Sequence, residues 1–333
     1  MKREDSVFIQ LSDLVVGYRG KALMTPLNGT VKKGELVSVI GHNGIGKSTL
    51  LRTLAGISER LHGSIIIDKT DIKKIDIRDF AKRVGYISTD IVTAPNMTVF
   101  DLIATGRYSY TNWLGSIKES DREVIFRSAL ETGITNLLDR YLSELSDGER
   151  QRSMIARVLA QDTDLLIMDE PAAFLDIRNR HEIISLLHRL TRTAGKTIIM
   201  STHDLPSAMG ESDVIWALDE NGITAGAPED LVLQGVFENM FTCDTVKFSK
   251  SDGNFCSLRE VRGEVVVTGT GMIAEWTKRA LARAGYRTSD SSSAAGLSVS
   301  CDETSQTWNV SIRGDKYVFG SLYDLSFFLR STF

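Results

Sequence analysis

The chain has 333 residues, of which 42% are hydrophobic and 25% charged, as in ordinary globular proteins. Its 39 Lys and Arg residues against 43 Asp and Glu give a net charge of -4, which argues against a role driven mainly by nucleic-acid binding. The length suggests about two domains, at roughly 150 residues each.

The sequence shows no sign of a membrane span or an export signal. It has no apolar run of about 18 residues. Residues 2–5 are charged, and the N-terminus lacks the apolar core of a signal peptide. The three cysteines, Cys243, Cys256 and Cys301, are far apart and fit neither a metal-ligand spacing nor an obvious disulfide framework. We therefore expect a cytoplasmic protein.

The first elements in chain order are short strands. Residues 6–40 alternate apolar and polar side chains and predict antiparallel strands that lead into a buried strand at 35–40. Tyr18 stands just before a glycine turn. Taken alone it is typical of a half-buried strand aromatic, and the alternative is a ring on which a nucleotide base stacks.

Residues 41–48, GHNGIGKS, match the phosphate-binding pattern G-x-x-x-x-G-K-[ST] at every fixed position. Strand 35–40 precedes the motif, and a helix at 48–56 with leucines at helical spacing follows it. Glycines let successive N–H groups point at phosphate oxygens, and a helix N-terminus favours an anion. Lys47 would reach the β- and γ-phosphates, and Ser48 would supply a hydroxyl to Mg²⁺. An ordinary glycine turn is the alternative.

The middle of the chain alternates strands and helices. The pattern predicts strands at 63–68 and 84–87, a mostly helical insertion at 97–160, a helix at 177–193, and strands at 164–170, 196–201 and 213–217. Apolar strands that alternate with helices predict a mostly parallel sheet covered on both faces.

From about residue 245 the character of the sequence changes. We expect strands at 264–268, 297–300, 307–312 and 316–319, helices at 272–284 and 322–329, and a polar loop at 289–295. The chain is thus expected to form an ATPase-type domain at 1–245, with a helical subdomain at 97–160, and a small α+β domain at 255–333. The motifs of that last domain give no chemistry, and we assign none.

Three further segments carry chemistry. Strand 164–170 ends in Asp169, which can join a Mg²⁺ shell, and Glu170, which can orient or deprotonate an attacking water. Residues 145–152 form a serine–glycine turn that opens a helix, where Ser146 and Gly148 offer a second anion site or merely a helix cap. His203 follows a buried strand at the edge where open α/β sheets bind ligands, although a lone histidine is more often structural.

Together these segments resemble the ATP-binding subunit of an ABC transporter. The order matches over about residues 6–243: aromatic Tyr18, Walker A at 41–49, signature at 145–149, Walker B at 165–170, D-loop at 173–176 and switch histidine His203. The resemblance implies a P-loop NTPase fold of the α/β class, with a RecA-like core, an antiparallel β subdomain and a helical subdomain. The signature between Walker A and Walker B is the most family-specific part.

The resemblance also implies roles for single residues. Tyr18 stacks on adenine, Ser48 and Asp169 hold Mg²⁺, Glu170 acts on the water, and His203 contacts the γ-phosphate together with the catalytic Lys47. The phosphates are held by Gly41, Asn43, Gly44, Gly46, Lys47, Ser48 and Thr49. Ser146 and Gly148 contact the ATP of a second copy in a head-to-tail dimer, with Asp176 at the seam.

Two positions depart from the family pattern. Thr89 stands where a glutamine usually contacts Mg²⁺, and its side chain is shorter, so we hypothesise that Asp90 or a water fills the gap. Unchanged Mg²⁺ dependence in Asp90→Ala, compared with Thr89→Gln, would exclude Asp90. Asp147 and Glu149 replace a glycine and a glutamine of the signature. They add repulsion near a triphosphate but suit a helix N-terminus.

Residues 97–108 look like those of importers for iron–siderophore, haem or cobalamin complexes. We therefore expect an ATPase that binds ATP and Mg²⁺, lies at the inner face of the membrane, and docks on transmembrane permease subunits served by a periplasmic or surface binding protein. One alternative is the ATPase of another ABC class, for lipid or drug export. Another is a regulatory ATP-binding subunit with weakened hydrolysis, which the Thr89 change motivates.

Overall fold

A computed structural model of the chain describes residues 6–88, 94, 96–111, 116–250, 253–258, 260–289 and 296–332. The chain divides into two compact units. Unit 1 comprises Met1–Thr242 and Phe248–Phe255, and unit 2 comprises Cys243–Lys247 and Cys256–Phe333. The limits of independently folding domains that the sequence suggests stay predictions.

The centre of unit 1 is a six-stranded sheet in the order β12-β11-β5-β10-β9-β8. Only β12 among these pairs antiparallel, and the other neighbours run parallel. All residues of β5, β9 and β10 are buried, which explains their continuous apolar sequences. The strands are β5 (Leu36–Gly41), β8 (Val84–Ile87), β9 (Leu165–Met168), β10 (Thr197–Ser201), β11 (Val214–Asp219) and β12 (Gly222–Gly226).

A second sheet of unit 1 is antiparallel, in the order β4-β1-β6-β7. Its alternating apolar residues, such as Ile9 and Leu11, share a buried cluster with Leu50 and Leu51 of α1. The strands are β1 (Val7–Val15), β4 (Leu27–Lys32), β6 (His62–Ile67) and β7 (Thr70–Asp71), and a short ribbon is formed by β2 (Gly17–Tyr18) and β3 (Lys21–Ala22).

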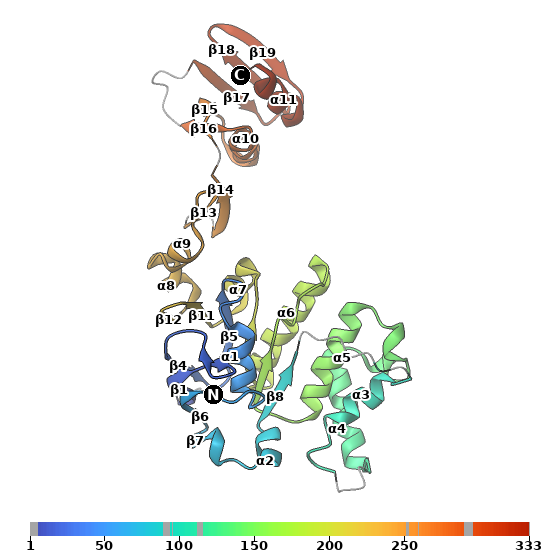
Figure 1. Ribbon diagram of the computed structural model, residues 1–333. Helices are drawn as coiled ribbons and strands as arrows, with labels where there is room; N and C mark the ends of the chain where they lie inside the picture. The colour runs from blue at the N-terminus through green and yellow to red at the C-terminus, as the bar shows by residue number, and fades with distance from the viewer. Residues whose placement is uncertain are drawn as a thin grey trace. The chain divides into compact units, whose positions relative to one another are not determined.

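The α-helices of unit 1 fall into two groups. Three pack on one another inside the predicted helical range and appear in green in Figure 1: α3 (Val99–Thr105), α4 (Glu119–Thr132) and α5 (Asp147–Ala160). Arg107, just after α3, is buried and pairs with Asp121 of α4 at 2.9 Å. The other helices are α1 (Lys47–Leu54), α2 (Ile77–Ala81), α6 (Ile177–Thr193), α7 (Leu205–Glu211), α8 (Pro228–Leu233) and α9 (Val236–Phe241).

Unit 2 contains a five-stranded sheet in the order β16-β15-β17-β18-β19. Strand β15 runs parallel to β16 and β17, whereas β18 and β19 are antiparallel additions. The elements are β15 (Gly263–Thr268), α10 (Gly271–Arg283), β16 (Tyr286–Ser289), β17 (Leu297–Asp302), β18 (Thr307–Ile312), β19 (Asp315–Phe319) and α11 (Leu322–Thr332). Val299, Leu281 and Leu325 are fully buried in its core.

One expectation for this region is wrong. Ser289 was expected in a loop but is the last residue of β16, because it pairs with Val266 of β15. Residues 290–295 of that loop lie outside the described residues. A two-stranded sheet made of β13 (Val246–Ser249) and β14 (Asn254–Ser257) was not expected from the sequence. Within the described ranges, no helix has both the length and the apolar character needed to cross a membrane.

Candidate functional site

The parallel pairing of three neighbouring strands brings the predicted chemistry together. β10 lies between β5 and β9, and all three run in the same direction. The segments that follow them are the glycine loop after β5, Asp169 and Glu170 after β9, and His203 after β10. Their side chains therefore gather at the carboxyl edge of the sheet, where open α/β sheets bind ligands.

The glycine loop has the conformation that its sequence predicts. Gly44 and Gly46 have φ values of 81° and 111°, in the region that favours glycine, and Gly46 is the N-cap of α1. A Cβ at Gly41 would lie 2.5 Å from the carbonyl oxygen of Leu218, whereas a Cβ at Gly44 would meet no atom within 4 Å. Gly41 thus fits the loop against β11, and Gly44 leaves open space.

Lys47 is the first residue of α1, and its side chain turns back into this loop. It is only 6% exposed, and its Nζ donates to the carbonyl oxygens of Gly41, at 2.7 Å, and His42, at 3.1 Å. Burial lowers the pKa of Lys47, although the nearby carboxylates of Glu170 and Asp169 act in the opposite direction. The structure thus provides a buried ammonium group beside two acids.

The remaining loop residues are open to solvent or half-buried. Asn43 and Ser48 are exposed, and Thr49 is half-buried in the first turn of α1. The His42 ring, which the sequence analysis did not single out, shares a hydrogen bond of 2.6 Å with the Met240 carbonyl oxygen and packs edge-on against Phe241. α9 therefore supports the outer side of the loop.

The two acids after β9 have different surroundings. Asp169 is 3% exposed and accepts a hydrogen bond of 2.6 Å from Ser201 Oγ. Glu170 has a φ of 48°, its N–H donates to the same Ser201 Oγ at 2.9 Å, and its Oε1 lies 2.5 Å from His203 Nε2. Asp169 is thus fixed, while Glu170 and His203 form a half-exposed pair.

Ser201 is a functional candidate that the sequence analysis missed. It ends the buried strand β10 and bridges both residues after β9. A polar side chain at the carboxyl end of a strand, directly after the apolar run Ile198–Met200, was the available signal. A second missed residue is Phe255 of β14, which lines a cavity of 370 Å³ together with Glu170 and His203.

The serine–glycine turn lies at the start of α5. Ser146 is the N-cap: Glu149 N donates to Ser146 Oγ at 3.4 Å, and Glu149 Oε2 accepts from Ser146 N, at 2.9 Å, and from Ser146 Oγ, at 2.8 Å. The backbone and side-chain hydrogen bonds from Ser146 lower the pKa of Glu149. Asp147 pairs with Arg150 at 3.5 Å. Both acids of the unusual signature therefore serve the helix start.

The contacts of this turn lie away from the glycine loop. A Cβ at Gly148 would lie 2.8 Å from Asn179 of α6, whose own N–H donates to Asp176 Oδ1 at 2.7 Å. The described contacts thus join Ser146 and Gly148 to α6, and join Asp176 to its own helix as the N-cap. Within one chain the structure does not bring these residues to Lys47.

Two other expectations concern Tyr18 and Thr89. Tyr18 is 68% exposed, with the Arg19 guanidinium 5.2 Å from the ring centroid. The prediction that Tyr18 is half-buried is therefore wrong. Its strand, β2, has two residues and pairs only with β3, outside the large sheets. Thr89 and Asp90 lie outside the described residues.

The residues present fit a nucleoside triphosphate and Mg²⁺. The open space at Gly44, the N-terminus of α1 and the buried Lys47 suit phosphate oxygens. Ser48 and Asp169 offer a hydroxyl and a carboxylate, which are hard oxygen ligands of the kind Mg²⁺ takes together with phosphate oxygens. Among the described residues, no group of three His, Cys, Asp or Glu side chains could hold a metal by itself.

Comparisons with known proteins agree with this geometry. The family model "ABC transporter" matches residues 24–173, and the model "Iron ABC transporter C-terminal domain" matches residues 262–330. The chain is 35% identical to the probable siderophore transport system ATP-binding protein of Bacillus subtilis (strain 168), over 70% of this chain and 86% of that protein. It is 35% identical to the ferric enterobactin transport ATP-binding protein of Escherichia coli (strain K12), over 68% of this chain and 84% of that protein.

A solved structure of a putative metal-chelate type ABC transporter in an inward-facing conformation has the same fold. It superposes with a TM-score of 0.60 at 26% identity and covers 68% of this chain and 85% of that chain. The predicted α/β P-loop fold is thereby confirmed. The chain belongs to the ATP-binding proteins of the ABC transporter family.

Proposed function

We propose that this ATPase powers the import of an iron–siderophore or related metal–chelate complex through separate membrane subunits. Two similarities together support this choice of transported compound. The ATPase part is similar to proteins named for siderophore and enterobactin transport, and residues 262–330 match a domain described by its occurrence in iron ABC transporters. Lipid or drug export has no comparable support at the C-terminal end of the chain.

The ATPase reaction is assigned to residues at the carboxyl edge of the parallel sheet. ATP would place its phosphates in the glycine loop, with Lys47 beside the β- and γ-phosphates. Mg²⁺, held by Ser48 and Asp169, would neutralise part of the phosphate charge. Glu170 would orient the water and take up its proton as it attacks the γ-phosphorus, which releases ADP and phosphate.

His203 supports this role of Glu170. In the structure its Nε2 contacts Glu170 Oε1, so the carboxylate is held without substrate. When ATP arrives, the imidazole would turn to a γ-phosphate oxygen and free the carboxylate for the water. Ser201 would act one step removed, because it fixes both Asp169 and the Glu170 backbone.

We further propose that two copies bind ATP between them, head to tail. The described contacts of Ser146 and Gly148 go to Glu149 and to Asn179 of α6 rather than to the glycine loop of the same chain, which supports a role at the nucleotide of a second copy. Tyr18, which is 68% exposed, would stack on the adenine. Closing and opening of this dimer would move permease subunits docked on the helices of unit 1.

The experiment that tests the reaction is Glu170→Gln. This variant should bind ATP, dimerise in its presence and lose hydrolysis by at least about a hundredfold, because general-base catalysis contributes that much. Phosphate release and size-exclusion chromatography measure the two properties. Glu123→Gln, exposed on α4, is the matched control and should behave as wild type. Wild-type turnover in Glu170→Gln would exclude the assigned role.

The cargo needs a second measurement. The chain is reconstituted in vesicles with the membrane subunits and binding protein encoded beside it, and uptake of a ⁵⁵Fe-labelled siderophore is followed. ATP-dependent uptake that Glu170→Gln abolishes supports the proposal. Export of a lipid or drug by the same assembly would favour the other transport class, and no hydrolysis at all would favour a regulatory subunit.

A further inference from the structure

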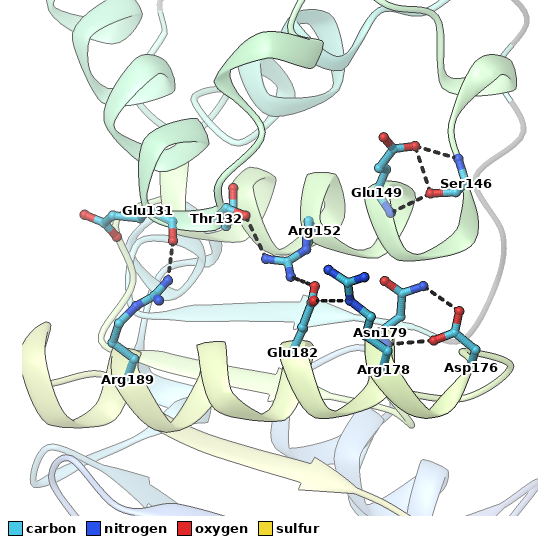
Figure 2. A network of polar contacts seen from close by, with 10 residues as sticks. All are labelled: Glu131, Thr132, Ser146, Glu149, Arg152, Asp176, Arg178, Asn179, Glu182 and Arg189. Carbon is cyan, nitrogen blue, oxygen red and sulfur yellow. Dashed lines mark hydrogen bonds and ion pairs between the residues drawn. The ribbon is translucent and has the colours of Figure 1, made fainter.

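Polar contacts drawn in Figure 2 join α6 to α5, through Arg152 and Glu182, and to the end of α4, through Arg189 and Glu131. Asn179, Glu182 and Arg189 of α6 are spaced so that they share one face of the helix, and this face is turned toward α5 and α4. We call this set of contacts the α5–α6 seam. Its members are Gly148 and Arg152 of α5, Asn179, Glu182 and Arg189 of α6, and the carbonyl groups of Glu131 and Thr132 of α4.

Arg152 is the central residue of the seam. Its Nη2 lies 2.6 Å from Glu182 Oε2, and its Nη1 donates to the Thr132 carbonyl oxygen at 3.1 Å. Thr132 is the last residue of α4, where the helix dipole favours a cation. The Arg152 side chain is 21% exposed and that of Glu182 is 38% exposed, so the pair is partly open to solvent. One guanidinium group therefore ties α5 to both α4 and α6.

Arg178 provides a natural contrast. It also contacts Glu182, with Nε 3.0 Å from Oε1, but its side chain is 88% exposed. Its contact is an i, i+4 pair within α6 and joins no second helix. Loss of Arg178 therefore removes a charge from the same carboxylate without opening the seam.

Gly148 explains why the two helix starts can approach so closely. A Cβ there would lie 2.8 Å from both Cγ and Oδ1 of Asn179, a distance that side chains do not tolerate. The Asn179 side chain is oriented by Asp176, because its Nδ2 donates to Asp176 Oδ2 at 2.9 Å, and the Asn179 N–H donates to Asp176 Oδ1. The signature turn thus rests on the amide that the D-loop residue Asp176 holds in place.

We propose that Arg152 and Asn179 are positioning residues that hold the signature turn and the D-loop of one chain in fixed register. Ser146 and Gly148 then reach the nucleotide bound to a second copy at the same time as Asp176 reaches the interface between the two copies. Neither positioning residue touches ATP. The inference rests on the proposed head-to-tail dimer, and it adds the physical link within each chain that makes the two contact segments move together.

The first test uses Arg152→Gln in the Glu170→Gln background, with Arg178→Gln as the matched control. Arg152→Gln should weaken ATP-dependent dimerisation by at least about twofold, the lower end for loss of a coupled contact. Binding of a fluorescent ATP analogue to the monomer should stay unchanged, because the glycine loop is untouched. Arg178→Gln should leave both quantities unchanged. Equal dimerisation in the Arg152 and Arg178 variants would overturn the proposal, as would a parallel loss of nucleotide binding.

The second test asks whether Gly148 acts through Asn179. Asn179→Ala in the Glu170→Gln background should weaken ATP-dependent dimerisation, because the amide on which Gly148 rests is gone, and it should leave binding of the fluorescent ATP analogue to the monomer unchanged. Dimerisation of Asn179→Ala at the level of Glu170→Gln alone would overturn the part assigned to Asn179.

A third measurement does not depend on the dimer. Hydrogen exchange of the nucleotide-free chain should show faster exchange at 146–152 and 176–182 in Arg152→Gln, with 47–54 unchanged. If Glu170→Gln fails to dimerise with ATP, the proposed function is wrong. The exchange data then decide separately whether the seam couples the two turns: unchanged exchange at both segments overturns the coupling.

Discussion

Unit 1 and unit 2 each contain a parallel strand that ends in a glycine turn and leads into a helix. In unit 1 the turn lies between β5 and α1, and in unit 2 it lies between β15 and α10. Gly269 and Gly271 of the second turn have φ values of 141° and 76°, as glycine-dependent as those of the phosphate loop. Both strands have parallel neighbours on either side.

The two turns differ in what faces the helix N-terminus. In unit 1 the first residue of α1 is the buried Lys47, and a Cβ at Gly44 would meet open space. In unit 2 no cation stands in the first turn of α10, and the Glu303 carboxylate lies against Gly271, with both oxygens 3.2 Å from the place of a Cβ. A glycine turn at a helix start is therefore half of a phosphate site, and the other half is a cation with room for the anion.

The largest effect is expected from Lys47→Ala, which removes the feature that unit 2 lacks. ATP hydrolysis should fall by at least about a hundredfold, because the variant loses the charge beside the transferred phosphate. Phosphate release measures turnover, and a fluorescent nucleotide measures binding. Thermal unfolding should show an intact fold, since the lost hydrogen bonds go to two loop carbonyl groups. Full ATP binding in this variant would mean that the glycine turn alone suffices to bind the phosphates. The cation would then not explain the difference between the turns of unit 1 and unit 2.

The strands of unit 1 could be predicted because they are buried on both faces, which leaves an uninterrupted apolar sequence in β5, β9 and β10. Elements held by distant partners could not. The hairpin of β13 and β14 has a mixed sequence, and its Phe248 is buried against Phe237 of α9, with ring centroids 5.6 Å apart. Nothing in a local pattern reveals that contact.

The candidate site shows the same division. Lys47, Asp169 and Glu170 each follow a strand of the parallel sheet, and residues that follow adjacent parallel strands meet at one edge. Their roles in catalysis stay predictions. Ser201 was missed, since its hydrogen bond to Asp169 depends on the pairing of β10 with β9. The Ser146–Glu149 cap was available from the sequence as a serine followed three residues later by glutamate.

An intermediate effect is expected from Gly271→Ala in unit 2. The positive φ costs about 1 kcal/mol for a side chain, and the new methyl group also presses on Glu303. Unit 2 should unfold at lower denaturant concentration while ATP turnover stays at the wild-type level. Gly314→Ala is the matched control, because its φ is 103° and no atom lies within 4 Å of its Cβ position. Loss of turnover with an intact fold would show that the second glycine turn takes part in nucleotide chemistry.

The smallest effect is expected from Glu303→Gln, which removes the charge that faces α10. An acid near a helix N-terminus contributes about 0.3–1 kcal/mol at low salt, so unit 2 should become less stable by that amount. The difference from wild type should shrink at high salt, because the carboxylate is exposed and screened. Denaturant unfolding at low and high NaCl measures both. The opposite result, a more stable variant that inorganic phosphate stabilises further, would mean that Glu303 blocks an anion site. Both glycine turns would then be able to bind an anion, and the turn of unit 2 would differ only by the carboxylate that blocks it.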